Sequence, residues 1–98
     1  MPRALSLESR VRRRTDLLTS AVSDEIVMFD MAKGNYYGLE PIGSWIWQQL
    51  GSTWAINALC DHLVRRYEID LDTGRGDVLE FLDGLHREGL IVLAEPEG

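Results

Sequence analysis

The segment from residue 56 to residue 67 has the strongest periodic pattern in the sequence, and it constrains the fold more than any other feature. Its apolar residues recur at the i, i+3, i+4 and i+7 spacing, which predicts an amphipathic helix. The residues in the pattern are Ile56, Leu59, Cys60, Leu63, Val64 and Tyr67. Such a helix must bury its apolar stripe against another layer, so the rest of the chain has to supply that layer.

Two further helices are predicted, one on each side of this segment. Pro41 suits the first turn of a helix, and Gly51 ends that helix. Ser52 or Thr53 would cap the periodic helix. The apolar residues of the earlier helix are Ile42, Trp45, Ile46 and Leu50.

Residues 68–76 are predicted as a polar loop with glycines, and the third helix begins within this stretch. It is expected to start at Asp72 or Thr73 and to stop at Gly89. One face of it is apolar and consists of Val78, Phe81, Leu82 and Leu85. Residues 90–93 form either a last strand or an extended tail on the core.

Before the helices, the sequence predicts three strands, over residues 15–22, 25–31 and 36–39. The second is rich in residues that favour strands, and Gly34 and Asn35 tolerate the positive φ of a turn. Strands followed by helices predict an α+β fold, with the helices on one face of a three-stranded antiparallel sheet. If the third strand is an edge, its free N–H and C=O groups offer a place for an extended peptide to add as a strand.

Charge is unevenly distributed along the chain. The net charge is −6, yet five of the ten basic residues fall within residues 1–14. We expect a flexible basic arm over residues 1–14 and one acidic domain over residues 15–94. An acidic body repels phosphate backbones, so nucleic acid is not expected as a partner. The sequence shows no apolar run of membrane-spanning length and no secretory signal, and a single cysteine suits a cytoplasmic location.

No constellation for catalysis or for a metal stands out in the sequence. His62 and His86 have no partners at metal-ligand spacing, and Cys60 points to a different side of its helix from His62. We therefore expect a protein that is not an enzyme and that has neither a cofactor nor a metal site.

The aromatic residues allow two interpretations. Trp45 fits the inner face of its helix, whereas Trp47 and Trp54 are expected to be partly exposed, either as packing at the rim or as contacts for a partner protein. Tyr36 and Tyr37 are adjacent in a strand and must face opposite sides of the sheet.

The ordered set of three segments carries a resemblance to a known family. The segments are FDMAKGNYYGLEPIGSWIWQQL, TWAINALCDHLVRRYEID and DVLEFLDGLHREGLI. Together they resemble the RiPP recognition element, the peptide-binding domain of the PqqD-like family, and most of all the stand-alone leader-binding proteins of lasso-peptide clusters. The resemblance covers about residues 15–93, and Glu40 departs from it where the family often has asparagine. The matching positions are Gly34, Tyr36, Tyr37, Leu39, Gly43, Trp47, Asp77, Val78, Phe81, Leu82 and Leu85.

The resemblance implies a winged-helix-like domain without catalytic activity. It implies that the leader peptide of a precursor adds to the third strand and places side chains between that strand and the third helix. A separate leader peptidase then cuts the leader, and a lasso cyclase acts afterwards. Asp77, Glu80 and Asp83 could attract a basic residue of the leader. The implied leader-binding residues are Asn35, Tyr36, Tyr37, Gly38, Leu39, Asp77, Val78, Phe81, Leu82 and Leu85.

Two alternatives stay open at this point. One is a PqqD-type chaperone in pyrroloquinoline quinone biosynthesis, which would have a radical enzyme as its partner. The other is a winged-helix DNA-binding protein, although the acidic third helix has the wrong charge for a recognition helix.

Overall fold

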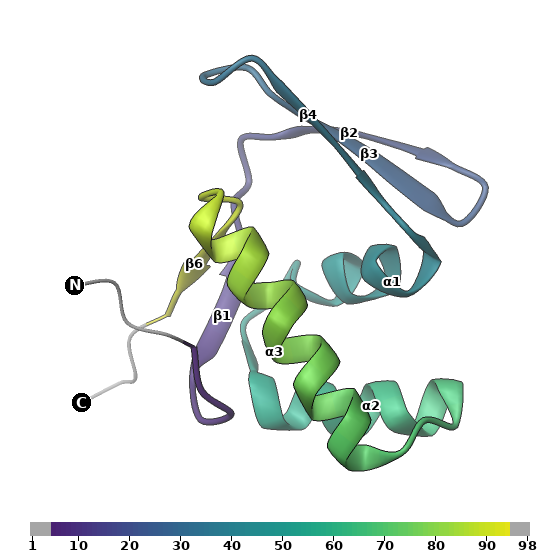
Figure 1. The fold of residues 1–98 in the computed structure, drawn as a ribbon. Coiled ribbons are helices and arrows are strands. Elements are labelled where there is room, and N and C mark those ends of the chain that lie inside the picture. Colours follow the sequence, from purple (N-terminus) through teal and green to yellow (C-terminus); the bar gives the residue numbers. More distant parts are fainter. Residues whose placement is uncertain (1–4, 95–98) are drawn as a thin grey trace.

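The computed structural model describes residues 5–94, which form two small antiparallel sheets and three helices (Figure 1). The elements in chain order are β1 (Arg10–Arg13), β2 (Leu18–Val22), β3 (Glu25–Asp30), β4 (Asn35–Leu39), α1 (Pro41–Gln49), β5 (Trp54–Ala55), α2 (Ile56–Tyr67), α3 (Leu71–Arg87) and β6 (Ile91–Leu93).

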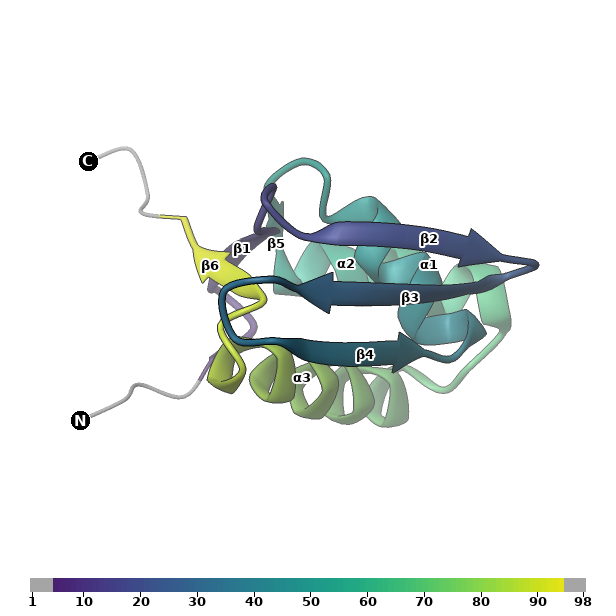
Figure 2. The same ribbon diagram turned by 90° about the horizontal axis from the view of Figure 1, so that it is seen from above.

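The sheet with strand order β2-β3-β4 is the one that the sequence predicts. Its two turns use positive φ, 61° at Ser23 and 71° at Gly34. The pleat of β3 turns Ile26 and Met28 into the core, and the opposite face of the sheet looks away from the helices (Figure 2). The α+β prediction, with three helices beside a three-stranded antiparallel sheet, is therefore confirmed.

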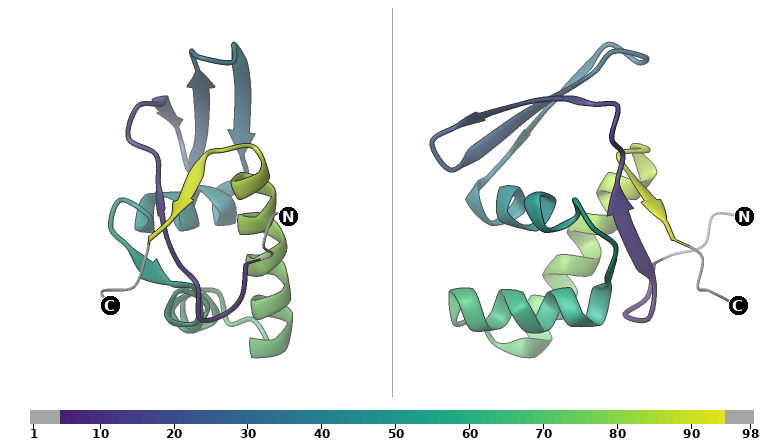
Figure 3. Two further views of the ribbon diagram at one scale, coloured as in Figure 1. Left: turned by 90° about the vertical axis from the view of Figure 1, so that its left-hand side faces the viewer. Right: turned by 180° about the vertical axis from the view of Figure 1, so that it is seen from behind.

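A second sheet, with strand order β5-β1-β6, was not predicted. Its central strand lies in the segment expected to be a flexible arm, and the side chain of Val11 there is 0% exposed. Figure 3 shows β1, in purple, beside β6, in yellow, so both ends of the chain contribute to this sheet. The arm prediction is thus wrong for residues 10–13, because cross-strand pairing outweighs the local excess of arginine; residues 1–4 lie outside the described residues.

The N-terminal segment also caps α2, in place of the predicted Ser52 or Thr53. The backbone N–H groups of Ile56 and Asn57 donate to the carbonyls of Ser9 and Leu7, both over 2.9 Å. These bonds satisfy two of the N–H groups that a helix leaves free at its start. The cap therefore comes from a distant part of the chain and leaves no local signal in the sequence.

Helix α3 starts earlier than predicted. Its cap is Asp70, whose Oδ2 accepts from the N–H of Thr73 over 3.2 Å, and Gly74 lies within the helix. A Cβ on Gly74 would lie 2.7 Å from Cγ1 of Val64, so this glycine allows α2 and α3 to approach closely. The prediction of a loop over residues 68–76 took that glycine as a turn signal, and it is wrong from residue 71 onward.

The two tryptophans of α1 exchange their predicted places. Trp47 is 2% exposed and belongs to the core, whereas Trp45 is half-buried and packs edge-on against Tyr67, with ring centroids 6.0 Å apart. Arg13 donates to the carbonyl of Trp47 over 3.1 Å, which ties β1 to this side of the helix. Arg13 also lies over the Trp47 ring, with its guanidinium carbon 5.9 Å from the ring centroid, so β1 helps to cover this tryptophan, while the sheet contacts of α1 are with β3 and β4.

Candidate functional site

The free edge of β4 is the first component of the candidate site. Within residues 5–94, β4 pairs only with β3, and no strand lies along its other side. Figure 2 shows this edge running above α3. An edge of five residues presents a row of N–H and C=O groups that can pair with another chain.

An apolar hollow of about 470 Å³ lies at the C-terminal end of β4. Its walls come from β4, α1, the end of α2 and α3. Most of the lining side chains are apolar, so the hollow suits apolar or aromatic groups. The principal lining residues are Leu39, Ile42, Gly43, Ile46, Leu63, Ile69, Val78 and Phe81.

A second, more open hollow of about 530 Å³ continues along α3 toward its C-terminal end. Asp77 and Phe81 line both hollows, so the two join into one groove between β4 and α3. We call it the β4–α3 groove. Carboxylates outnumber cations at the second hollow, and its lining residues are Tyr37, Asp77, Glu80, Phe81, Gly84, Leu85, Arg87, Glu88 and Leu90.

The ring of Phe81 is placed by the absence of a side chain at Gly43. A Cβ on Gly43 would lie 3.1 Å from both Cε1 and Cζ of that ring. The ring is half-buried and forms part of the boundary between the two hollows. Glycine in the first turn of α1 therefore controls the shape of the groove.

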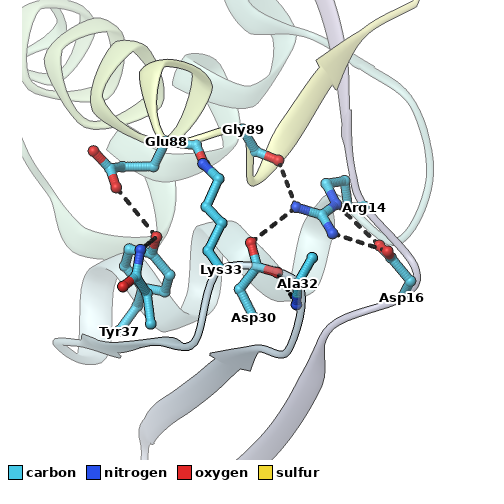
Figure 4. A network of polar contacts seen from close by, with 9 residues as sticks. Arg14, Asp16, Asp30, Ala32, Lys33, Tyr37, Glu88 and Gly89 are labelled. Atoms are coloured by element: carbon cyan, nitrogen blue, oxygen red, sulfur yellow. Dashed lines mark hydrogen bonds and ion pairs between the residues drawn. The ribbon is translucent and has the colours of Figure 1, made fainter.

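A network of polar contacts joins the start of β4 to the end of α3 (Figure 4). The hydroxyl of Tyr37 donates to Oε1 of Glu88 over 3.1 Å, and Nζ of Lys33 donates to the carbonyl of Glu88 over 2.7 Å. These contacts fix one end of the groove.

Arg14 extends the same network toward the core. Its Nη1 donates to Oδ2 of the buried Asp30 and to the carbonyl of Gly89, each over 3.1 Å. Asp16 also accepts from the guanidinium, and this hydrogen bond holds the pKa of the Asp16 carboxyl below its ordinary range. Arg14 thus adds to Lys33 and Tyr37 in joining the second turn of the sheet to the end of α3.

Comparison with known proteins identifies the family. The sequence profile of Coenzyme PQQ synthesis protein D (PqqD) matches residues 25–91, from β3 to the start of β6, which is more than half of the chain. The chain belongs to the PqqD family. The predicted resemblance to PqqD-like RiPP recognition elements is thereby confirmed. Among curated proteins, none matches this chain.

A solved structure extends the likeness to nearly the whole PqqD-family chain. It is "TbiB1 in Complex with the TbiA(beta) Leader Peptide", with a TM-score of 0.73 and 26% sequence identity. The match covers 89% of this chain and 99% of TbiB1. TbiB1 is therefore a structural relative over nearly the whole of its solved chain, and its structure contains a leader peptide.

Most of the residues expected to bind a leader in this PqqD-family chain meet at the β4–α3 groove. Those that line it are Tyr37, Gly38, Leu39, Asp77, Val78, Phe81 and Leu85. Leu82 lies in the core beneath it, and Asn35 lies at the start of β4, where its Nδ2 donates to the Tyr37 hydroxyl over 3.2 Å. The side chain of Tyr36 is on the other face of the sheet, against Phe29. Of the other acids singled out, Glu80 borders the groove and Asp83 borders neither hollow.

Several residues of the groove were not expected from the sequence. Ile42 and Ile46 fall on the apolar stripe of α1, and that stripe indicated core rather than groove. Ile69 and Glu88 gave no signal, because their places depend on how α2 and α3 end.

The expected partner contacts at Trp47 and Trp54 differ in their outcome. Burial of Trp47 removes its side chain from the surface, so that prediction is wrong. Trp54 is half-buried and packs edge-on against His62, with ring centroids 4.9 Å apart. A contact at Trp54 stays a prediction.

The described residues do not offer a metal site or a membrane span. Residues 5–94 contain no group of three His, Cys, Asp or Glu side chains that could hold a metal ion. Cys60 is fully buried, and burial raises the pKa of its thiol, which disfavours the nucleophilic thiolate. Helices long and apolar enough to cross a bilayer are likewise absent from the described part of the chain.

Proposed function

We propose that this PqqD-family protein binds the leader segment of a ribosomally made precursor peptide, which adds as a strand to the free edge of β4. The observation that carries the proposal is the coincidence of that edge with an apolar groove along α3. The complex of TbiB1 with a leader peptide supports it, because TbiB1 shares the fold over nearly its whole length.

Strand addition separates affinity from specificity. Backbone hydrogen bonds to β4 do not depend on the sequence of the leader. Alternate side chains of the added strand would point toward the groove, where Leu39, Val78 and Phe81 receive apolar groups. The acids Asp77 and Glu80 at the groove would favour a basic residue on the leader.

The protein would act without catalysing a reaction. By holding the leader it raises the local concentration of the precursor at a separate leader peptidase, and a lasso cyclase would act on the product. The genes beside a precursor test this part of the proposal, since a lasso cluster contains both enzymes.

The family description supports a second candidate, a PqqD-type chaperone in pyrroloquinoline quinone biosynthesis. This candidate uses the same groove with a different precursor. A neighbouring radical enzyme, together with a short precursor that bears Glu and Tyr, would favour it over the lasso assignment.

The decisive experiment is fluorescence polarisation with a labelled leader peptide from the neighbouring precursor gene. The wild type should bind saturably, and Phe81→Asp should weaken binding by roughly 100-fold because it places a carboxylate in an apolar groove. Phe81→Leu is the matched control and should retain most of the affinity.

Two further readouts make the result interpretable. Circular dichroism must show that Phe81→Asp is folded. Leader peptides N-methylated at single positions should lose affinity at every second residue, since a strand turns alternate amides toward its partner. Uniform tolerance of N-methylation would rule out strand addition, and saturable, salt-dependent binding of duplex DNA in place of the leader would favour the DNA-binding alternative.

A further inference from the structure

The outer face of the larger sheet, which looks away from the helices, is unusually apolar for an exposed surface. Register places Leu18, Phe29 and Tyr36 in one row across the three strands, with Val27 in the next row. Leu18 is 57% exposed, Val27 41% and Tyr36 74%. We call these four residues the outer patch.

The outer patch is not flat but has a shallow hollow beside two packed aromatic rings. The rings of Phe29 and Tyr36 stack at a tilt of 35° with centroids 4.5 Å apart. A shallow hollow of about 160 Å³ lies beside them, lined mainly by Leu18, Val27 and the two rings. The hollow gives an apolar side chain of a partner a place to insert.

The size of the outer patch indicates the kind of partner. Three strands of about five residues, spaced about 4.8 Å apart with a rise of about 3.3 Å, cover about 240 Å². A stable interface buries about 800 Å² on each partner. A second copy of the chain, joined through this face alone, would therefore be held weakly.

A bound leader would enlarge this face. A strand added at the edge of β4 continues the sheet beside Tyr36 and presents alternate side chains on the same side as the outer patch. The protein and the leader would then share one surface, and a partner that contacts both would recognise the loaded state.

Charged residues at the rim of this face indicate which charges a partner would carry and at which end. Asp24, Glu25 and Glu40 lie at the same end of the sheet, because β3 begins there and β4 ends there. At the opposite end Nζ of Lys33 is directed to the carbonyl of Glu88. A complementary partner has an apolar centre and a basic rim on the side of the three carboxylates.

We propose that the outer patch, together with the outward side chains of the bound leader, is the docking surface for the enzyme that acts on the precursor. This rests on the proposed function, because the leader completes the surface. Leader and enzyme then bind with reciprocal coupling, so each raises the affinity of the protein for the other.

The test uses a catalytically inactive form of the leader peptidase encoded beside the precursor, with its binding measured by biolayer interferometry. Loading the wild type with leader should raise its affinity for the peptidase by roughly tenfold. The double variant Leu18→Ser, Val27→Ser should lose that gain and keep its affinity for labelled leader within about twofold, because neither side chain lines the β4–α3 groove. Leu93→Ser removes a comparably exposed leucine from β6 and should behave like the wild type.

Each outcome decides between the two proposals. Failure of the folded wild type to bind leader would overturn the proposed function and this inference with it. Normal leader binding, with peptidase affinity unchanged in the double variant or not increased by leader, would overturn the docking surface alone. A dimer in sedimentation that dissociates in the double variant would assign the outer patch to self-association and would also overturn the docking surface.

Discussion

The sheets β5-β1-β6 and β2-β3-β4 have the same number of strands but very different edges. The edge strands of the first are two and three residues long, and its central strand buries Val11. The second ends in β4, an edge of five residues above an apolar groove. Short edges give another chain little to pair with, whereas a long edge beside a groove provides both backbone and side-chain contacts.

From this contrast we expect the two sheets to have different roles. The first pairs β1 with β6, from opposite ends of the described chain, and the residues just before β1 cap α2, so substitutions there should change stability. The second should carry the ligand, so substitutions along its groove should change affinity.

The largest expected effect is a loss of stability on substitution in the sheet β5-β1-β6, and it sharpens the contrast between the two sheets. Val11→Ala removes two methyl groups from a fully buried site and should lower the free energy of unfolding by about 2 kcal/mol. Leader affinity, measured where the variant is still folded, should stay within about twofold. Urea denaturation and fluorescence polarisation measure the two quantities.

Val22→Ala is the matched control, because its side chain is exposed on β2 and its loss should change stability by less than about 0.5 kcal/mol. A parallel loss of leader affinity in folded Val11→Ala would contradict the expectation that the first sheet affects stability and only the second affects leader binding.

A smaller effect is expected at the groove. Gly43→Ala brings a Cβ within 3.1 Å of the Phe81 ring, which must shift by a few tenths of an ångström. Leader affinity should fall by about threefold, since the ring borders both hollows. Stability should change little, because alanine favours the helix by about 1 kcal/mol and offsets the crowding.

Gly76→Ala serves as the control for the same substitution. A Cβ there meets nothing within 4 Å, so the variant should gain stability and keep its affinity. Equal affinities for the two alanine variants would show that the Phe81 ring does not shape the leader site.

The smallest effect concerns pH and the contact of Arg14 with Asp16. Since Arg14 lowers the pKa of Asp16 in the folded state, the pair stabilises the protein above the ordinary pKa of 3.8. This contribution is lost as the pH falls through the lower, folded value. Asp16→Asn should therefore have a slightly lower Tm than the wild type near neutral pH, and the difference should vanish in strong acid.

Asp24→Asn provides the reference, because that exposed carboxylate forms no ion pair among the described residues. A Tm difference for Asp16→Asn that persists unchanged in strong acid would contradict the assignment. Leader affinity should be the same in all three proteins near neutral pH.

Local signals determined a large part of this fold. The periodic apolar residues of α2 match the observed helix, and the glycine turn before β4 has the expected positive φ. The order of elements predicted an α+β fold in which the third strand would offer a place for a peptide if it lay at an edge, and seven of the ten residues implied by the family resemblance line the groove. Each of these depends on a pattern within a few turns or one strand, which the sequence displays directly.

The tertiary structure decided the rest, through contacts between distant segments. Val11 stands among arginines and becomes core only because β5 and β6 pair on either side of it. Trp47 is buried with help from Arg13 of β1, which lies over its ring, and Gly74 is a packing residue rather than a turn because α2 approaches it. Local propensity is weak compared with burial, so a residue whose neighbours come from far along the chain takes its role from them.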